Sequence, residues 1–298
     1  MSSLRKYQKD PKYVISNAVH LFRSSQKKTL VVEGVSDYKF FHQWMDPKSD
    51  IRVVDVDGKE NVEEVYKLWL KSHKNINDCL YLVADVDYDF IINNKLKFID
   101  DCFLYNFYCN SSNRPLFNDL ESFLFNTSAL EKLLVNYLIP KDESPLIRDQ
   151  VEQLTKIVGC YRAANEILSV GKKKTIIDGL NLLEFCEFKS FSFNVTTFKE
   201  RLKSYSPRKL DLDEFYDKAD ELYSSTQPKW FFSRGHDITE ILSLYLSEKI
   251  GKNIHPTAIE LNLRLAANIQ TFKKSTVGVQ LTNLIVKDGL KFFEDADL

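Results

Sequence analysis

Acidic residues stand where two apolar, strand-like segments end. In "TLVVEG", Glu33 follows one apolar run, and in "YLVADVDYD", Asp85 and Asp87 follow another. Because successive side chains of a strand alternate between faces, Asp85 and Asp87 are expected on one side of it, about 6.7 Å apart. Clustered carboxylates repel one another unless a cation neutralises them, and hard oxygen ligands favour magnesium, with manganese as a substitute. These three residues are therefore candidate metal ligands.

Three more aspartates lie close to these motifs in the sequence. Asp89 extends the alternating series, but it stands where the strand is expected to have ended, so its role stays open. Asp55 and Asp57 repeat the acidic pattern in "VVDVDG", one strand earlier. That segment is also typical of a turn that leads into a helix, and we favour the turn over a metal-binding role.

Two later segments carry further candidate residues. In "FNDLESFLF", Asp119 suits the N-cap of a helix and Glu121 its first turn, which is a sufficient structural reason for both. In "FSRGHDI", Arg234 can hold a phosphate through two hydrogen bonds, and His236 can donate to a phosphate or relay a proton. The structural alternative is a helix N-terminus capped by Asp237. We favour a functional role and expect this segment beside the metal-binding acids.

The elements that must position these residues alternate in type along the first part of the chain. Strand-like runs are separated by amphipathic, helix-length segments, and Ser36 is a suitable N-cap for one of them. This order predicts an α/β fold with right-handed crossovers and a mainly parallel sheet flanked by helices. Glu33, Asp85 and Asp87 would converge at the edge where parallel strands end. The expected strands are 29–34, 51–58, 79–89 and 103–110, with helices at 13–22, 36–45 and 61–73.

The pattern changes near residue 125. Long amphipathic segments with little strand character follow, which predicts a mostly helical C-terminal region. We therefore expect a metal-binding α/β domain at residues 1–125 and a mostly helical domain at 126–298 that completes the active site and offers a partner or dimer interface. No long flexible linker separates them, so they are expected to pack together.

The composition is that of an ordinary globular protein of 298 residues, with 44% hydrophobic and 28% charged residues. Its 41 basic and 42 acidic residues give a formal net charge of -1, so any contact with nucleic acid must be a local patch. The segment "GKKKT" lacks the spacing of a phosphate-binding loop, which excludes nucleotide hydrolysis by this chain. The candidate basic patches are Lys172, Lys173, Lys174, Arg208, Lys209, Lys273 and Lys274, although such runs are usually solvated.

The amino terminus lacks the apolar core of a signal peptide, and no segment is apolar for the length of a membrane span. We therefore expect a cytoplasmic protein without membrane contact. The cysteines have neither paired spacing nor histidines at zinc-finger spacing, which favours reduced thiols over disulfides or structural zinc. They are Cys79, Cys102, Cys109, Cys160 and Cys186.

The order of "VVEGVSD" and "VADVDYD", each in its strand and helix context, resembles the Toprim domain of topoisomerases, primases and several nucleases. That family carries a glutamate after its first strand and an Asp-x-Asp after its third, and Glu33, Asp85 and Asp87 match these positions. Each motif is short, but their order, context and spacing agree. The resemblance implies a Toprim-like sheet with magnesium bound by these acids.

A narrower resemblance covers nearly the whole chain. The succession "VEGVSD", "ADVDYD", "NDLESFLF" and "RGHDI" is similar to the Toprim-like nucleases that are paired with an ABC-type ATPase in the PARIS anti-phage defence system. It implies that Glu33 is the essential acid, that Asp85 and Asp87 bind metal, and that Asp119 and Glu121 are further acids near the metal ions. It also implies cleavage of RNA, with transfer RNA as the expected substrate, after a phage trigger releases the protein from its ATPase.

The predicted function is thus hydrolysis of phosphodiester bonds with two magnesium ions. Asp85 and Asp87 would hold metal, Glu33 would bind metal or move a proton, and Arg234 and His236 would act on the phosphate. We expect an ATPase-bound inactive state and a free homodimer that cleaves RNA. Two alternatives stay open: a Toprim nuclease that cuts DNA, and a non-catalytic module that docks on the ATPase and regulates it.

Overall fold

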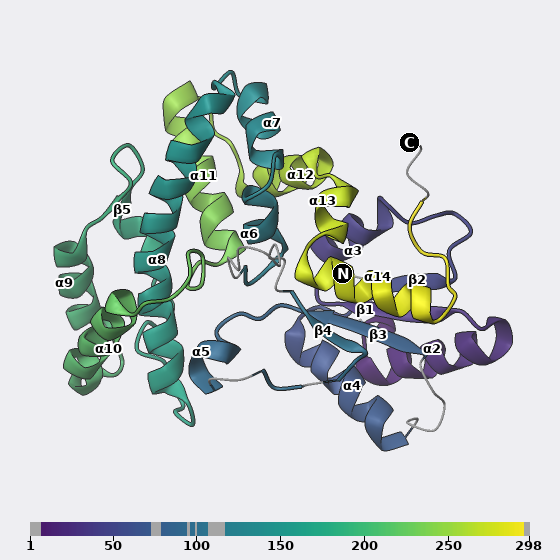
Figure 1. The fold of residues 1–298 in the computed structure, drawn as a ribbon. Coiled ribbons are helices and arrows are strands. Elements are labelled where there is room, and N and C mark those ends of the chain that lie inside the picture. Colours follow the sequence, from purple (N-terminus) through teal and green to yellow (C-terminus); the bar gives the residue numbers. More distant parts are fainter. Residues whose placement is uncertain (1–6, 73–78, 94–95, 99, 107–116, 295–298) are drawn as a thin grey trace. The chain divides into compact units, whose positions relative to one another are not determined.

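Four short strands pair in parallel to form a sheet of order β2-β1-β3-β4 (Figure 1), as the alternation of strands and helices predicts. The central strands β1 and β3 are buried along their whole length, which suits a sheet covered on both faces. In the register, Val32 of β1 lies beside Asp55 of β2 and Val83 of β3, so these strands end at one edge. The strands are β1 (Lys28–Val32), β2 (Ile51–Asp55), β3 (Leu80–Ala84) and β4 (Phe103–Tyr105).

The computed structural model describes residues 7–72, 79–93, 96–98, 100–106 and 117–294. The chain divides into two compact units. The sheet unit consists of Met1–Asp85, Phe98–Phe107 and Phe272–Leu298, and the helical unit of Val86–Lys97 and Tyr108–Thr271.

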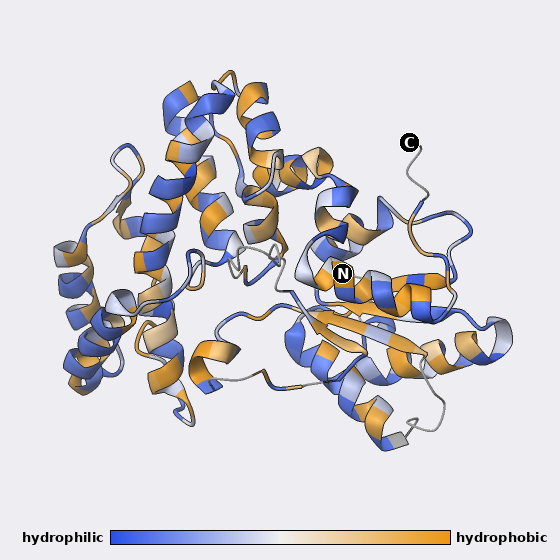
Figure 2. Cartoon of the chain, in the orientation of Figure 1, coloured by the Kyte–Doolittle hydropathy of each residue, from blue (hydrophilic) through white to orange (hydrophobic). Residues whose placement is uncertain are grey.

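Helices cover both faces of the sheet (Figure 1). α2 and α4 pack against each other on one face, and α3 and α14 lie on the other. The right-handed crossover from β1 to β2 places α3 on one side, and the crossover back from β2 to β3 places α4 on the opposite side. Figure 2 shows hydrophobic strands between helices that are hydrophobic on one side and hydrophilic on the other. These helices are α2 (Pro11–Ser25), α3 (Val35–His42), α4 (Lys59–Ser72) and α14 (Thr276–Lys287).

The C-terminal segment belongs to the sheet unit, although it is far from the sheet in sequence. The ring of Phe272 packs edge-on against Phe40 and Phe41 of α3, with centroid distances of 5.2 and 5.5 Å. At the start of β1, Lys28 Nζ lies 2.5 Å from Asp288 Oδ2. The compact units therefore differ from the predicted division into residues 1–125 and 126–298.

Helix α3 begins two residues after Glu33, the glutamate that follows β1. Gly34 is its N-cap, in place of the predicted Ser36, and the Gly34 N–H donates to Asp37 Oδ2 at 3.2 Å. The Val56 N–H donates to Val32 O and the Gly58 N–H to Glu33 O, so the loop after β2 holds the end of β1. Glu33 thus lies between the last residue of a buried strand and the N-cap of a helix.

The helical unit is built around α8, a helix of 26 residues that packs along α10 and α11. Gly159 lets α8 approach the segment before α11, since a β-carbon there would lie 2.7 Å from the carbonyl carbon of Phe232. The α-helices are α5 (Asp89–Asn93), α6 (Leu120–Phe125), α7 (Ala129–Asn136), α8 (Ser144–Ser169), α9 (Val195–Tyr205), α10 (Leu212–Ser224), α11 (Gly235–Ile250) and α12 (Pro256–Ala266). The shorter elements are η1 (Lys141–Glu143), η2 (Leu182–Phe185), η3 (Lys209–Asp211) and the antiparallel pair β5 (Cys186–Glu187) and β6 (Ser192–Phe193), and α13 (Ile269–Lys273) spans the boundary between the units.

Four of the five cysteines are buried, and Cys109 lies outside the described residues. Burial raises the pKa of Cys160 and of Cys186 to about 12, which keeps both thiols protonated. Among the described helices, none has both the length and the apolar character that a membrane span requires.

Candidate functional site

The carboxyl edge of the sheet carries Glu33, Asp85 and Asn106, which together are called the edge cluster here. Each directly follows the last residue of a strand: β1, β3 and β4, respectively. The backbone N–H of Asp85 donates to Glu33 Oε1 at 2.7 Å, and Asn106 Nδ2 donates to Asp85 Oδ1 at 2.5 Å. Three neighbouring parallel strands thus bring two carboxylates and one amide together at a shared edge.

Asn106 is the buried member of the edge cluster. It is 1% exposed, and its backbone N–H donates to Ala84 O at 2.8 Å, which continues the pairing of β3 with β4. Its side-chain Oδ1 is buried and has no hydrogen-bond partner in the described part of the chain. Leaving a buried acceptor unsatisfied costs about 1–3 kcal/mol. The amide contacts Asp85 through Nδ2, and an amide oxygen such as Oδ1 is a donor that hard cations accept.

Asp87 does not continue the strand that precedes it. β3 ends at Ala84, and Asp87 has a φ of 49°, in the left-handed region. The prediction that Asp85 and Asp87 alternate along one strand face is therefore wrong. The chain enters the helical unit at Val86, whose N–H donates to Asn118 O at 3.0 Å. The structure thus describes the two aspartates in separate units.

Asp55, Asp57 and Asp89 lie at a strand end, in a turn and at a helix start, respectively. Asp55 ends β2, and Asp57 has a φ of 56° in the turn before α4. Lys9 forms ion pairs with both, at 2.5 Å for Asp57 Oδ1. The turn that the sequence favours at this place is therefore present. Asp89 is the first residue of α5 and lies beyond the strand.

Asp119 is the N-cap of α6, and Glu121 lies in its first turn, as the structural interpretation of this segment predicts. Asp119 Oδ1 accepts hydrogen bonds from the Ser122 hydroxyl and from the Ser122 N–H, the latter at 2.8 Å. Asp119 Oδ2 accepts one from the Gly235 N–H at 2.6 Å, so this carboxylate joins the starts of α6 and α11. Burial raises the pKa of Asp119, against the effect of these hydrogen bonds.

The two helix starts meet at Gly235. A β-carbon at this position would lie 2.5 Å from Glu121 Cβ and 2.9 Å from Asp119 Cγ. Glu121 and Asp119 are both buried. The glycine of the "RGHDI" segment is therefore needed for the close approach of α11 to the acids of α6.

Arg234, the N-cap residue of α11, directly precedes Gly235 at this junction. Burial lowers the pKa of Arg234, but Tyr88 and the negative charges of Asp87, Asp237 and Asp119 raise it by more. The guanidinium therefore stays charged. Within the helical unit, the charges of two predicted site acids, Asp87 and Asp119, therefore act on Arg234.

His236 stands on the exposed side of the first turn of α11. Its side chain is 75% exposed, and Nδ1 lies 3.2 Å from Glu260 Oε1 of α12. This hydrogen bond raises the pKa of His236 to about 9 and lowers the pKa of Glu260. The imidazole is then protonated at neutral pH, so it is suited to donate a proton or to bind a phosphate, and unsuited to act as a base.

Asp237 does not cap α11, so the alternative prediction for this residue is wrong. It lies in the first turn of the helix, and its two carboxylate oxygens accept hydrogen bonds from Arg162 at 2.9 and 2.8 Å. The paired Arg162 side chain belongs to α8. Asp237 therefore holds α11 against α8.

Sequence reasoning missed Asn106, Glu260 and Arg162. The predicted fourth strand ran from 103 to 110, which hid the position of Asn106 at the end of a three-residue strand. An asparagine directly after "FLY" is the signal that was available. For Glu260 and Arg162 the sequence offers none, because each is far from its partner along the chain.

Among the described residues, no group of three or more histidine, cysteine, aspartate or glutamate side chains is arranged to hold a metal ion. The edge cluster is a different donor set, with two carboxylates and an amide oxygen. Comparison with protein-family models finds no match for this chain, and comparison with curated proteins finds none either. The function is therefore inferred from the residues and their geometry.

Proposed function

We propose that this protein is a metal-dependent nuclease that hydrolyses phosphodiester bonds at the edge cluster. The observation that carries the proposal is the position of Glu33, Asp85 and Asn106 at the ends of three adjacent parallel strands. Open α/β sheets bind their ligands outside this edge. Glu33 and Asp85 also match the glutamate and the first aspartate of the Toprim pattern.

The donors of the edge cluster fit a magnesium ion. Glu33 and Asp85 offer carboxylate oxygens, and Asn106 offers a buried amide oxygen that accepts from no described residue. Asp87 is a further ligand in this proposal. A bound ion supplies Lewis acidity toward water and the phosphate oxygens. The protein itself orients the donors, since the Asp85 N–H holds Glu33 and the Asn106 amide holds Asp85.

In the helical unit, Arg234 and His236 are the proposed phosphate-directed groups. A charged arginine can bind two phosphate oxygens at once, and a protonated histidine can give its proton to the leaving oxygen. Asp119 and Glu121 stay proposed as further acids near the metal ions. Their place at helix N-termini is also favourable without a metal ion.

The proposed substrate is RNA, transfer RNA in particular, and the proposed setting is anti-phage defence in the bacterial cytoplasm. An ABC-type ATPase would hold the protein inactive, and the released protein would act as a homodimer. These parts of the proposal rest on the resemblance to Toprim-like defence nucleases.

Gel electrophoresis after incubation with Mg²⁺ and labelled transfer RNA, messenger RNA or plasmid DNA tests the proposal. We expect RNA cleavage that a chelator stops and that Glu33→Gln abolishes. Glutamine keeps the acceptor for the Asp85 N–H and removes only the charge. The matched control is Glu64→Gln on the exposed side of α4, which should cleave like wild type. Cleavage by folded Glu33→Gln at the wild-type rate contradicts the site assignment.

The two alternatives give other outcomes. Cleavage of plasmid DNA with intact RNA would favour the DNA nuclease. No cleavage, together with no heat of binding for Mg²⁺ or Mn²⁺ in calorimetry, would favour a non-catalytic module. If the nuclease is confirmed, Arg234→Ala and His236→Ala should each lower the cleavage rate by about 10².

A further inference from the structure

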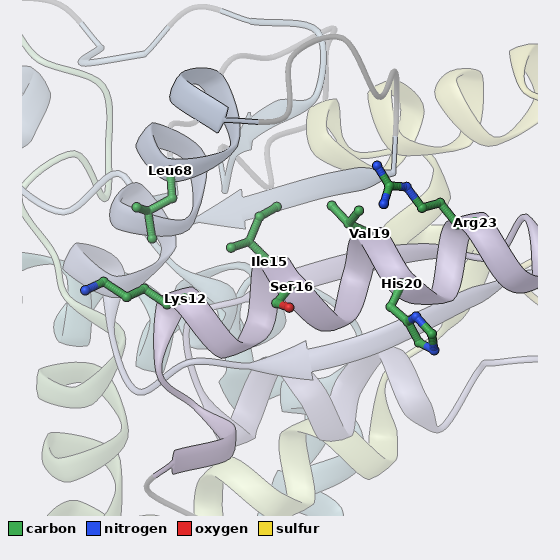
Figure 3. A pocket seen from close by; sticks show the side chains of 7 residues that line it. All are labelled: Lys12, Ile15, Ser16, Val19, His20, Arg23 and Leu68. Carbon is green, nitrogen blue, oxygen red and sulfur yellow. The ribbon is translucent and has the colours of Figure 1, made fainter.

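A groove of about 460 Å³ lies between α2 and α4 in the sheet unit (Figure 3). Its floor is apolar. Ile15 and Val19 of α2 point toward α4, and Leu68 of α4 points toward them. Its rim is polar and cationic. The rim residues are Lys12, Ser16, His20 and Arg23, all exposed on α2.

Lys12, His20 and Arg23 form a row that is called the α2 row here. Their side chains make no ion pair or hydrogen bond within the described part of the chain. Lys12 and Arg23 are eleven residues apart on a helix, which places them about 20° apart around the axis and about 16 Å apart along it. In a protein with a net charge of -1, the α2 row is a local concentration of positive charge along an open groove.

The α2 row begins at the edge of the sheet that carries the edge cluster. Lys9, just before α2, pairs with Asp55 at the carboxyl end of β2. From there α2 runs back along the sheet toward the start of β1. A ligand that lies along the helix from Arg23 to Lys12 would therefore be directed toward the edge cluster.

We propose that this groove binds a single-stranded segment of nucleic acid and directs it to the edge cluster, an inference that rests on the proposed nuclease function. The α2 row would contact successive phosphates. The bases or riboses would cover the apolar floor formed by Ile15, Val19 and Leu68. A duplex keeps its bases inside and offers only phosphates, so the floor favours a single strand, such as a loop of a folded RNA.

Fluorescence anisotropy with a labelled single-stranded RNA of about 12 nucleotides tests this, at several salt concentrations and with a chelator present. All proteins carry Glu33→Gln, so that nothing is cut. Replacing Lys12, His20 and Arg23 with alanine should weaken binding at least about tenfold at low salt. It should also reduce the slope of log Kd against log salt by about 1.4, since the contacts of Lys12 and Arg23 with phosphates of a single strand contribute about 0.7 each. The matched control, Lys287→Ala on α14, should bind within about twofold of its parent.

Exposed cations contribute little to stability, so the triple variant should melt with its parent. Unchanged affinity and slope in the triple variant would overturn the groove. If the triple substitution weakened the binding of an RNA duplex as much as the binding of single-stranded RNA, the single-stranded ligand would be overturned. Tighter binding of polyglutamate than of RNA would overturn it as well. The binding assay needs no cleavage. Row-dependent binding in this assay, together with no cleavage by the wild-type protein, would overturn the nuclease alone. Cleavage by the wild-type protein, together with row-independent binding, would overturn the groove alone.

Discussion

Asn106 sets the arrangement of the edge cluster through one side chain. An amide can donate to Asp85 and still offer its own oxygen, which neither an ionised carboxylate nor an aliphatic side chain can do. Because Asn106 is buried, it also holds its partner in one orientation. The acids alone therefore do not define the cluster.

Asn106→Asp should make the stability of the protein depend on pH and on Mg²⁺. The new carboxyl group would be buried beside Asp85, so burial and repulsion would raise its pKa above that of the unfolded chain. The variant should therefore be less stable than wild type by about 1–3 kcal/mol at pH 8, and recover as the pH falls through the raised pKa. Saturating Mg²⁺ should restore stability at pH 8. Thermal melting at pH 5 and pH 8, with chelator or Mg²⁺, measures both effects.

The control for this variant is Asn283→Asp, which adds the same charge at an exposed position of α14 and should change stability by less than about 0.5 kcal/mol. Equal melting of Asn106→Asp and wild type at pH 8 with chelator would contradict the close packing of Asn106 against Asp85.

The pair of His236 and Glu260 should add a small pH-dependent contribution to stability. The pKa of His236 is raised from 6.5 to about 9, so the contribution is complete below pH 6.5 and is lost as the pH rises through 9. The imidazole is largely exposed, so the pair is worth about 0.5 kcal/mol. Glu260→Gln should lower the melting temperature by about 1–2 °C at pH 6 and leave it unchanged at pH 10.

His236→Gln removes the other half of the pair, so at each pH it should match Glu260→Gln: a loss of about 1–2 °C at pH 6 and none at pH 10. A loss that persists at pH 10 in Glu260→Gln would show that Glu260 acts through a different contact, such as its hydrogen bond with Thr239.

At the scale of elements, the sequence predicts the centres of the strands and misplaces their ends. The predicted strand 79–89 stops at Ala84, because its partner β4 has only three residues and the pairing ends at Tyr105. Val86 and Tyr88 favour strands by type, yet they serve the helical unit. Strand propensity is local, whereas the length of a strand depends on its neighbour, so the presence of β1 to β4 was predictable and their ends were not.

The junction of α6 with α11 predicts that Gly235→Ala is destabilising. A β-carbon there would overlap Glu121 and Asp119, which are buried and held by their own helix, so neither can move away easily. Overpacking of this kind costs about 1–3 kcal/mol in the free energy of unfolding, which urea denaturation can measure. Gly34→Ala is the control, since its β-carbon would find its nearest neighbour, Asp37 Oδ2, at 3.6 Å. Comparable stability of the two variants would contradict the tight junction.

At the scale of the whole chain, local patterns indicate what each segment becomes but not which segments pack together. The chain does become mostly helical after about residue 125. However, Val86–Lys97, from the predicted first domain, belongs to the helical unit, and Phe272–Leu298, from the predicted second domain, belongs to the sheet unit. The candidate acids were found because their types and order are local properties. Asn106 and Glu260 were missed because their roles arise from tertiary contacts.

The ion pair of Lys28 with Asp288 joins residues that are 260 positions apart, and it ties α14 to the sheet. Lys28 is 4% exposed, its Nζ lies 4.8 Å from the centre of the Tyr81 ring, and the Tyr81 hydroxyl also donates to Asp288. Burial raises the pKa of Asp288, but the hydrogen bonds from Lys28 and Tyr81 lower it by more. The pair therefore stabilises the fold above about pH 4, and this contribution is lost as the pH falls through the lowered pKa of Asp288.

Asp288→Asn should leave the buried ammonium of Lys28 without a counter-charge and cost about 3 kcal/mol. Urea denaturation at pH 7 measures the loss. The gap from wild type should narrow as the pH falls below about 4, where the Asp288 carboxyl group becomes protonated in the unfolded chain, and it should close below the lowered pKa of Asp288 in the fold. Lys28→Met combined with Asp288→Asn should recover most of the loss, because it removes the unpaired charge and keeps the volume. If the double variant is no more stable than Asp288→Asn, the unpaired ammonium is not the cause, and α14 must be held to the sheet mainly by its apolar contacts.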